Sequence, residues 1–185
     1  TGPAGLEPRH EAGPWAIDRF LEEPLETRFL QSFKTFAASK AFQHTTIGGT
    51  NYVFEDLLTA LMVKFRAHAV PAIEHLPKRI VLGRPVTFAG GSPDAQLART
   101  RYEAAFRGLG CREIHHVYEP VAAAFYFAQR LTRDATVLVA VFGGGTSDFS
   151  IIRFEVTDKG VRAHPLSQSG IGIAEVLEAI VTRIP

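Results

Sequence analysis

The sequence is poor in features that mark several large classes of protein. Cys111 is the only cysteine among 185 residues, so no internal disulfide can form, which fits a reducing compartment. No apolar run approaches the ~18–20 residues that span a bilayer, so we expect no membrane partner. Twenty Lys and Arg residues nearly balance 19 Asp and Glu residues, and no basic block suggests nucleic-acid binding. These absences favour a cytoplasmic globular protein.

The length and composition are those of one ordinary domain or of one large lobe. Hydrophobic residues make up 46% of the chain, which is enough for a packed core. Residues 1–13 are rich in Pro and Gly and are expected to be a flexible leader, or the middle of a longer chain.

Hydrophobic periodicity predicts helices and strands in alternation, followed by a hairpin meander. Helices are expected over residues 14–21, 27–37, 54–69, 121–131 and 174–184, and one more after Ser92, with Ser92 as cap, Pro93 at the first position and Gly108 near the end. Strands are expected over residues 79–88 and 113–119, in a hairpin over 135–156, and over 160–170. This order predicts a mixed-sheet α/β fold.

The hairpin carries the pattern with the most chemistry. An apolar run from Val137 stops at Gly143-Gly144-Gly145-Thr146, and a second alternating run follows. Bare glycines let several N–H groups converge on phosphate oxygens, while Thr146 adds a hydroxyl and Asp148 a carboxylate that can hold Mg²⁺ through water. The alternative is an ordinary tight turn, with Asp148 pointing to solvent.

Other polar residues have plain structural alternatives. His115 and His116 are adjacent on an expected strand, so their rings face opposite sides and do not share a metal ion. We assign no side chain as a metal ligand. Lys34 alone would be a helix-surface lysine, and Glu119 before Pro120 could simply end a strand and begin a helix. The aromatic residues 125–127 are expected in the core.

Three segments, taken in order, resemble a known family. They are Ile80-Val-Leu-Gly-Arg-Pro-Val-Thr-Phe88, Tyr118-Glu-Pro-Val-Ala-Ala-Ala124 and Phe142-Gly-Gly-Gly-Thr-Ser-Asp148. This combination resembles the ATPase domain of the DnaK-like, seventy-kilodalton heat-shock chaperones, and looks most similar to the YegD-type branch. The resemblance covers residues 14–173 and implies an actin-like, ribonuclease-H-like fold, present here as an incomplete lobe.

The resemblance also implies roles for individual residues. Gly143, Gly144, Gly145 and Thr146 match a loop that faces the β- and γ-phosphates of ATP, and Asp148 matches a carboxylate near Mg²⁺ and its water. Glu119 matches a hinge glutamate near the magnesium shell, Lys34 a lysine that reaches the γ-phosphate, and Pro85 a proline linked to nucleotide signalling. Residues 14–131 would then be part of a first lobe with an inserted helical subdomain and a connecting helix. Residues 132–185 would hold the phosphate-loop hairpin and the start of a truncated second lobe.

The sequence departs from the family at three places. Val141 stands where the family has an Asp two residues before the loop, and no Asp-x-Gly-Thr motif precedes residue 20. The chain also stops soon after the loop, and residues 175–185 do not continue the family pattern. We therefore expect a fragment or degenerate form of a chaperone-type ATPase, an ATP hydrolase by resemblance but inactive as this chain, with a client protein or co-chaperone as partner. The alternative is a non-enzymatic interaction or structural module that keeps the fold and self-associates.

Overall fold

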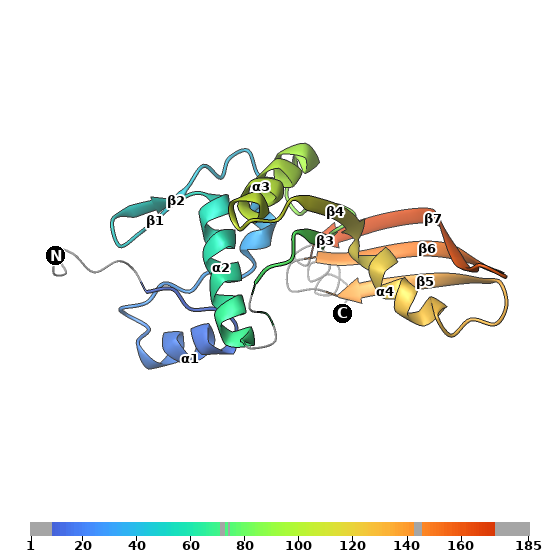
Figure 1. The fold of residues 1–185 in the computed structure, drawn as a ribbon. Helices are drawn as coiled ribbons and strands as arrows, with labels where there is room; N and C mark the ends of the chain where they lie inside the picture. Colours follow the sequence, from blue (N-terminus) through green and yellow to red (C-terminus); the bar gives the residue numbers. More distant parts are fainter. Residues whose placement is uncertain (1–8, 71–72, 74, 143–145, 173–185) are drawn as a thin grey trace. The chain divides into compact units, whose positions relative to one another are not determined.

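The computed structural model describes residues 9–70, 73, 75–142 and 146–172, which form a mixed α/β structure (Figure 1). The described chain divides into two compact units. Unit 1 comprises Thr1–Arg79 and Leu97–Glu113, and unit 2 comprises Ile80–Gln96 and Ile114–Pro185. The α/β class expected from the sequence is confirmed at this level, whereas the lobe boundary expected near residue 131 stays a prediction.

Unit 1 is built mainly from helices. Its elements are α1 (Pro14–Glu22), η1 (Phe33–Phe36), the β1–β2 hairpin (Thr45–Ile47 and Thr50–Tyr52), α2 (Phe54–Ala69) and most of α3 (Ala95–Gly108). The core forms where Phe54, Leu57 and Leu58 of α2 are buried, with the Phe54 ring set edge-on to Tyr102 of α3 at 5.4 Å. The helix expected over residues 54–69 is confirmed, and Asp56 stabilises its start by accepting a hydrogen bond from the Val53 N–H at 3.1 Å.

The helix expected over residues 27–37 is wrong. Only the short 3₁₀ helix η1 forms there, and it begins just after Ser32, whose φ of 52° lies in the left-handed region and interrupts any helix. The Arg101 guanidinium, which is buried, then donates hydrogen bonds to the carbonyl oxygens of Phe36 and Ala37 at 2.9 and 3.0 Å. The tertiary contact therefore overrides the local helical pattern.

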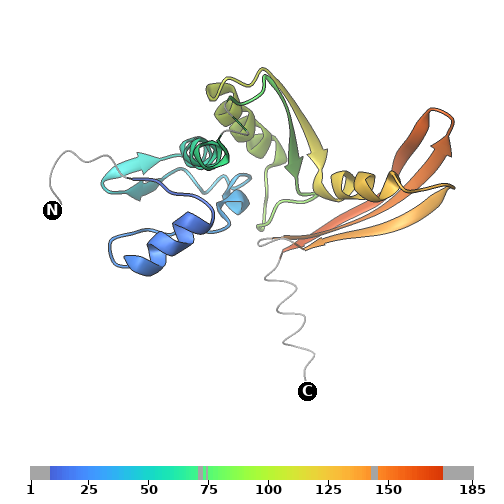
Figure 2. The same cartoon turned by 60° about the horizontal axis from the view of Figure 1, so that its bottom comes forward.

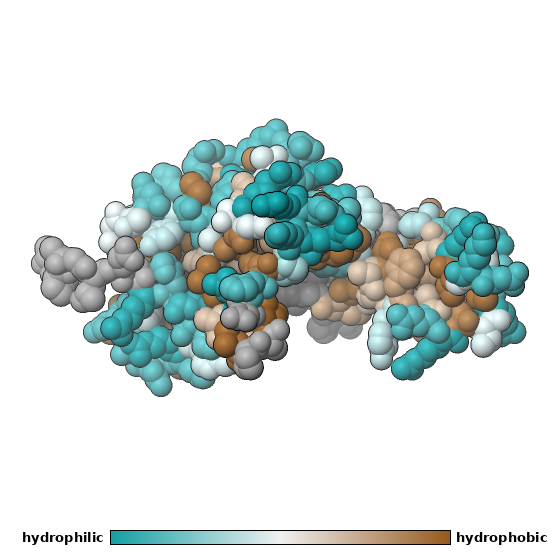
Figure 3. Space-filling model, in the orientation of Figure 1, coloured by the Kyte–Doolittle hydropathy of each residue, from teal (hydrophilic) through white to brown (hydrophobic). Residues whose placement is uncertain are grey.

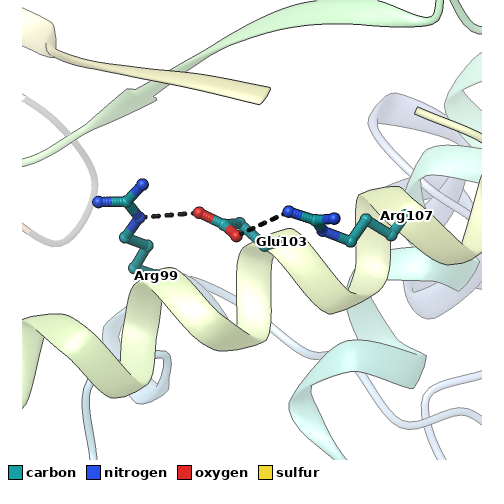
Figure 4. A network of polar contacts seen from close by, with 3 residues as sticks. All are labelled: Arg99, Glu103 and Arg107. Carbon is teal, nitrogen blue, oxygen red and sulfur yellow. Dashed lines mark hydrogen bonds and ion pairs between the residues drawn. The ribbon is translucent and has the colours of Figure 1, made fainter. Parts of the chain in front are cut away.

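The start of α3 also differs from the prediction. The helix begins at Ala95, and Asp94, not Ser92, accepts a hydrogen bond from the Gln96 N–H at 3.0 Å. Asp94 thus occupies the capping position because its carboxylate reaches the second helical N–H. Further along α3, Glu103 lies between Arg99 and Arg107 one turn away on either side and contacts both (Figure 4).

Unit 2 is built around strands. β3 (Arg79–Arg84) pairs with β4 (Glu113–Tyr118), and the two arrows point the same way in Figure 2, as the intervening crossover through α3 requires. α4 (Glu119–Ala128) follows β4 directly, and the antiparallel sheet of β5 (Ala135–Phe142), β6 (Thr146–Thr157) and β7 (Gly160–Gly172) comes last. The expected hairpin and the strand after it are confirmed, while the helix expected over residues 174–184 lies outside the described residues.

One face of the β5–β6–β7 sheet packs against α4. Ile152 and Phe154 of β6 are buried against Ala124 and Ala128 of α4, with Val137 and other partly buried side chains around them. Burial alternates strictly along β5, as a sheet with one covered face requires. The aromatic residues of α4 expected in the core, Phe125, Tyr126 and Phe127, are instead 45–69% exposed, and apolar surface is visible over α4 in Figure 3.

Candidate functional site

The candidate site is centred on the four residues from Gly83 to Val86, at the end of β3. Asp148 Oδ1 on β6 accepts a hydrogen bond from the Val86 N–H at 2.9 Å. Asp148 is 1% exposed, and Pro85 is fully buried as well. The alternative in which Asp148 points to solvent is therefore wrong. Its carboxylate ties the hairpin to the Gly83–Val86 segment, a tie between positions that are 62 residues apart.

Glu119 approaches the same segment from α4. It is the first residue of that helix and is half-buried, where a carboxylate interacts favourably with the positive end of the helix dipole. A Cβ added to Gly83 would lie 3.1 Å from Glu119 Cγ and 3.6 Å from its Oε1. Gly83 thus makes the room that the Glu119 side chain occupies. Glu119 lies at the junction between β4 and α4, as the structural alternative expected. Its side chain also packs against Gly83.

Arg84 places its positive charge against Tyr118. Its guanidinium lies over the Tyr118 ring, with the central carbon 4.4 Å from the ring centroid, and its Nη2 donates a hydrogen bond to the Tyr118 hydroxyl at 2.6 Å. Arg84 follows Gly83, and Tyr118 precedes Glu119. Sequence reasoning gave no role to Gly83, Arg84 or Tyr118, although the Gly-Arg-Pro triplet was the available signal.

The hairpin tip is described in part. Gly143, Gly144 and Gly145 lie outside the described residues, and Thr146 is placed as the first residue of β6. Val141 of β5 lies directly opposite Asp148 of β6 in the strand register. Directly opposite residues share a face, so Val141 presents an isopropyl group beside Asp148.

Lys34 belongs to a different part of the molecule. It lies in η1 of unit 1 and is half-buried, whereas Glu119 and Asp148 belong to unit 2. The structure brings the two carboxylates to one segment, and the expected approach of Lys34 to them stays a prediction.

The groups described here do not fit a directly held Mg²⁺ ion. Asp148 is sealed from solvent with one oxygen already accepting an N–H, and its cross-strand neighbour is apolar. Within the described ranges, no three His, Cys, Asp or Glu side chains are grouped to bind a metal. Any Mg²⁺ at this site would be held mainly by phosphate oxygens and water, which is a common mode for this ion.

The remaining reactive side chains have structural explanations. Burial raises the pKa of the Cys111 thiol, which is 2% exposed, so the reactive thiolate is disfavoured. On β4, His115 is exposed and His116 is half-buried, in agreement with the opposite orientations expected for strand neighbours.

The chain matches no family model. Among the residues that the structure describes, no helix combines the length and the apolar character needed to cross a bilayer.

Proposed function

We propose that this chain is part of a chaperone-type ATPase nucleotide-binding domain with an actin-like fold, and that in isolation it binds ATP weakly and does not hydrolyse it. The observation that carries the proposal is the hydrogen bond from Val86 to Asp148. It links the strand leaving the glycine tip to the proline segment after β3, and Glu119 packs against the same segment. Two of the three motifs behind the resemblance thus meet in space at the third.

The same geometry argues that binding is weak. Phosphoryl transfer depends on positioned charges around the phosphates and the metal. Here Asp148 is buried in a backbone contact, and Val141 supplies no carboxylate beside it. Loss of one such outer partner typically lowers metal affinity or activity ~10–100-fold. The groups that the resemblance assigns to phosphate binding are the N–H groups of Gly143, Gly144 and Gly145, the hydroxyl of Thr146, and Lys34.

An NMR titration of backbone amides with Mg-ATP tests this proposal. We expect saturable shifts in residues 142–148 with a Kd of about 1 mM or weaker, which corresponds to about 4 kcal/mol of binding. Thr146→Val should weaken the response, because it removes the hydroxyl from the loop. The matched control is Thr136→Val, which makes the same substitution at an exposed position of β5 and should change nothing.

Four results would count against the proposal. Inorganic phosphate alone could reproduce the shifts, or the shifts could spare residues 142–148, and either result would remove the nucleotide site. A micromolar Kd, or phosphate release above the buffer rate, would overturn the claim that the isolated chain is weak and inactive.

A second candidate function is a non-enzymatic interaction module. Exposed aromatic residues on α4, together with Leu138 and Phe142 on β5, which are 68% and 73% exposed, favour it. Apolar surface of this kind often marks a protein-interaction site. Size-exclusion chromatography with light scattering separates the candidates: self-association without any ATP response favours the module, and a monomer with the localised response favours the ATPase lobe.

A further inference from the structure

Helix α1 lies on the surface of unit 1 and is attached to it by two aromatic contacts. Trp15 stacks on His68 of α2 with ring centroids 3.5 Å apart, and Phe20 stacks on Phe29 at 5.2 Å. The helix lies at the edge of the unit beside α2 (Figure 1), and none of its nine residues is buried. The two contacts therefore hold α1 in place without enclosing it.

The aliphatic residues of this region take no part in these contacts. Ile17 and Leu21 are one helical turn apart, so they lie on the same side of α1. Ile17 is 49% exposed, Leu21 is 70% exposed, and Leu25, in the turn after the helix, is 99% exposed. A side chain as exposed as Leu25 gains almost nothing from folding. We define the aliphatic row as Ile17, Leu21 and Leu25. Apolar residues four apart are the anchors by which a helix docks in the groove of a partner.

The same segment is acidic. Residues 16–26 include four acidic residues and one basic residue, so their formal charge is −3, in a chain whose net charge is +1. The basic residue, Arg19, is paired with Glu22 at 3.9 Å and with Glu23 at 3.1 Å. The other two acidic residues, Asp18 and Glu26, are exposed and are adjacent in sequence to two members of the aliphatic row. The aliphatic row is thus accompanied by negative charge.

This charge decides which kind of partner fits. A second copy of the chain, related by a two-fold axis, would bring the carboxylates of the segment against the same carboxylates, which is unfavourable. Membrane surfaces and nucleic acids are anionic, so they would repel the segment as well. A protein groove with an apolar floor and lysine or arginine side chains on its rim matches both the aliphatic row and the carboxylates.

We propose that α1 and the turn after it form a recognition helix that docks, through the aliphatic row, in an apolar groove of a partner protein with a basic rim. Trp15 and Phe20 anchor the helix to unit 1, while the aliphatic row remains available to the partner. This surface belongs entirely to unit 1, and the inference does not depend on ATP binding.

NMR titrations of the full chain with two helical peptides test the proposal. The first peptide has leucine on one side and lysine on the other, and so carries the chemistry proposed for the partner. The second peptide has glutamate in place of every lysine. With the lysine peptide we expect saturable shifts of the backbone amides of residues 15–26, and an affinity that falls as salt is raised. The glutamate peptide should produce no such shifts.

Two matched pairs of variants locate the binding. Leu21→Ser should weaken binding of the lysine peptide about tenfold, because it removes a leucine side chain that becomes buried on binding. Leu138→Ser, at a position of β5 that is 68% exposed, should leave the affinity unchanged. Asp18→Asn should weaken binding about twofold, as expected for an exposed ion pair, whereas Asp158→Asn, which is exposed in unit 2, should have no effect. Circular dichroism verifies that each variant is folded.

The proposal fails if the lysine peptide does not shift residues 15–26, or if both peptides shift them equally. Equal affinities of the Leu21→Ser and Leu138→Ser variants, or shifts confined to residues 138–151, would mean that the peptide binds on the sheet of unit 2 instead. A dimer in light scattering that Leu21→Ser converts to monomer would mean that a second copy of the chain covers the aliphatic row.

Discussion

Different kinds of contact stabilise the interior of each unit. In unit 1, Arg101 reaches chain positions 59 to 65 residues away and donates hydrogen bonds to the carbonyl oxygens of Phe36, Ala37, Ser39 and Phe42. In unit 2, neighbouring strands pair in register, and their alternating side chains pack against α4. Unit 1 therefore combines its apolar core with one buried polar side chain that makes four long-range contacts, whereas unit 2 combines regular strand pairing with apolar contacts to α4.

The largest expected effect is the loss of the Arg101 contacts. Arg101→Ala should destabilise unit 1 by about 3 kcal/mol, because four carbonyl groups lose their donor in a site that is nearly closed to water. Trp15, the only tryptophan, belongs to unit 1, so its fluorescence in a urea titration reports this unit. Arg101→Lys should recover only part of the loss, since an ammonium group lacks the planar fork of donors.

The control for this prediction lies on the same helix. Arg99→Ala removes an exposed ion pair with Glu103 at 2.8 Å (Figure 4), and exposed pairs are worth less than about 1 kcal/mol. If Arg99→Ala cost as much as Arg101→Ala, the contrast between a buried backbone contact and an ordinary surface arginine would fail.

This contrast explains how much of the fold the sequence could predict. Local periodicity gave α2 and the three strands of the meander, because in them the buried face is set by neighbouring residues. It failed at residues 27–37, where the apolar spacing is helical but Arg101, far away in sequence, takes the carbonyl groups of the loop. No local pattern could reveal that partner.

The second prediction tests whether unit 2 also has one critical polar contact. Asp148→Ala leaves the Val86 N–H without its acceptor next to fully buried Pro85, and should cost about 2 kcal/mol. Asp148→Asn keeps an oxygen acceptor and should cost less. Hydrogen exchange of the Val86 amide measures the contact directly: it should accelerate in the Ala variant and stay protected in the Asn variant. Fast exchange of this amide in the unmodified protein would mean that the contact is not maintained.

The candidate site was predictable only in part, for a related reason. The glycine tip, Glu119 and Asp148 stand out as residue types that contact phosphate or metal, so sequence reasoning selected them. Gly83 escaped notice because its role is to have no side chain where Glu119 packs, and that role depends on a tertiary contact. The burial of Asp148 was missed for the same reason, since a carboxylate near a turn is normally solvated.

The third prediction tests whether the absence of a side chain at Gly83 matters. Gly83→Ala should destabilise unit 2 by about 1 kcal/mol, because the new Cβ meets Glu119 Cγ at 3.1 Å. The double variant Gly83→Ala with Glu119→Ala should lose most of this penalty, since it removes the atom that is contacted. Denaturation of the four proteins of this cycle gives the coupling free energy. Additive effects would show that Gly83 and Glu119 are not in contact.

The smallest expected effect concerns a surface pair in unit 1. Glu11 Oε1 lies 3.0 Å from His68 Nε2, and Trp15 stacks on the His68 ring with centroids 3.5 Å apart. The hydrogen bond from His68, with the charge of nearby Lys64, lowers the pKa of Glu11 below its ordinary value of 4.5. This folded-state pKa is lower than the unfolded one, so the pair adds stability above about pH 4.5. That stability is lost as the pH falls through the folded-state pKa.

Comparison with a similar pair in unit 2 shows whether this pH dependence is local. Urea titrations followed by Trp15 fluorescence at several pH values measure the free energy of unfolding of unit 1. Glu11→Gln should reduce the decrease of this free energy at acid pH, because the carboxylate that titrates is gone. Glu155→Gln removes the carboxylate that lies 3.2 Å from His164 in unit 2, and should leave the Trp15 signal unchanged. If the decrease in stability at acid pH persisted in Glu11→Gln, or changed equally in Glu155→Gln, the acid sensitivity of unit 1 would come from groups other than this pair. The pH dependence of stability would then be more similar in the two units than their different contacts suggest.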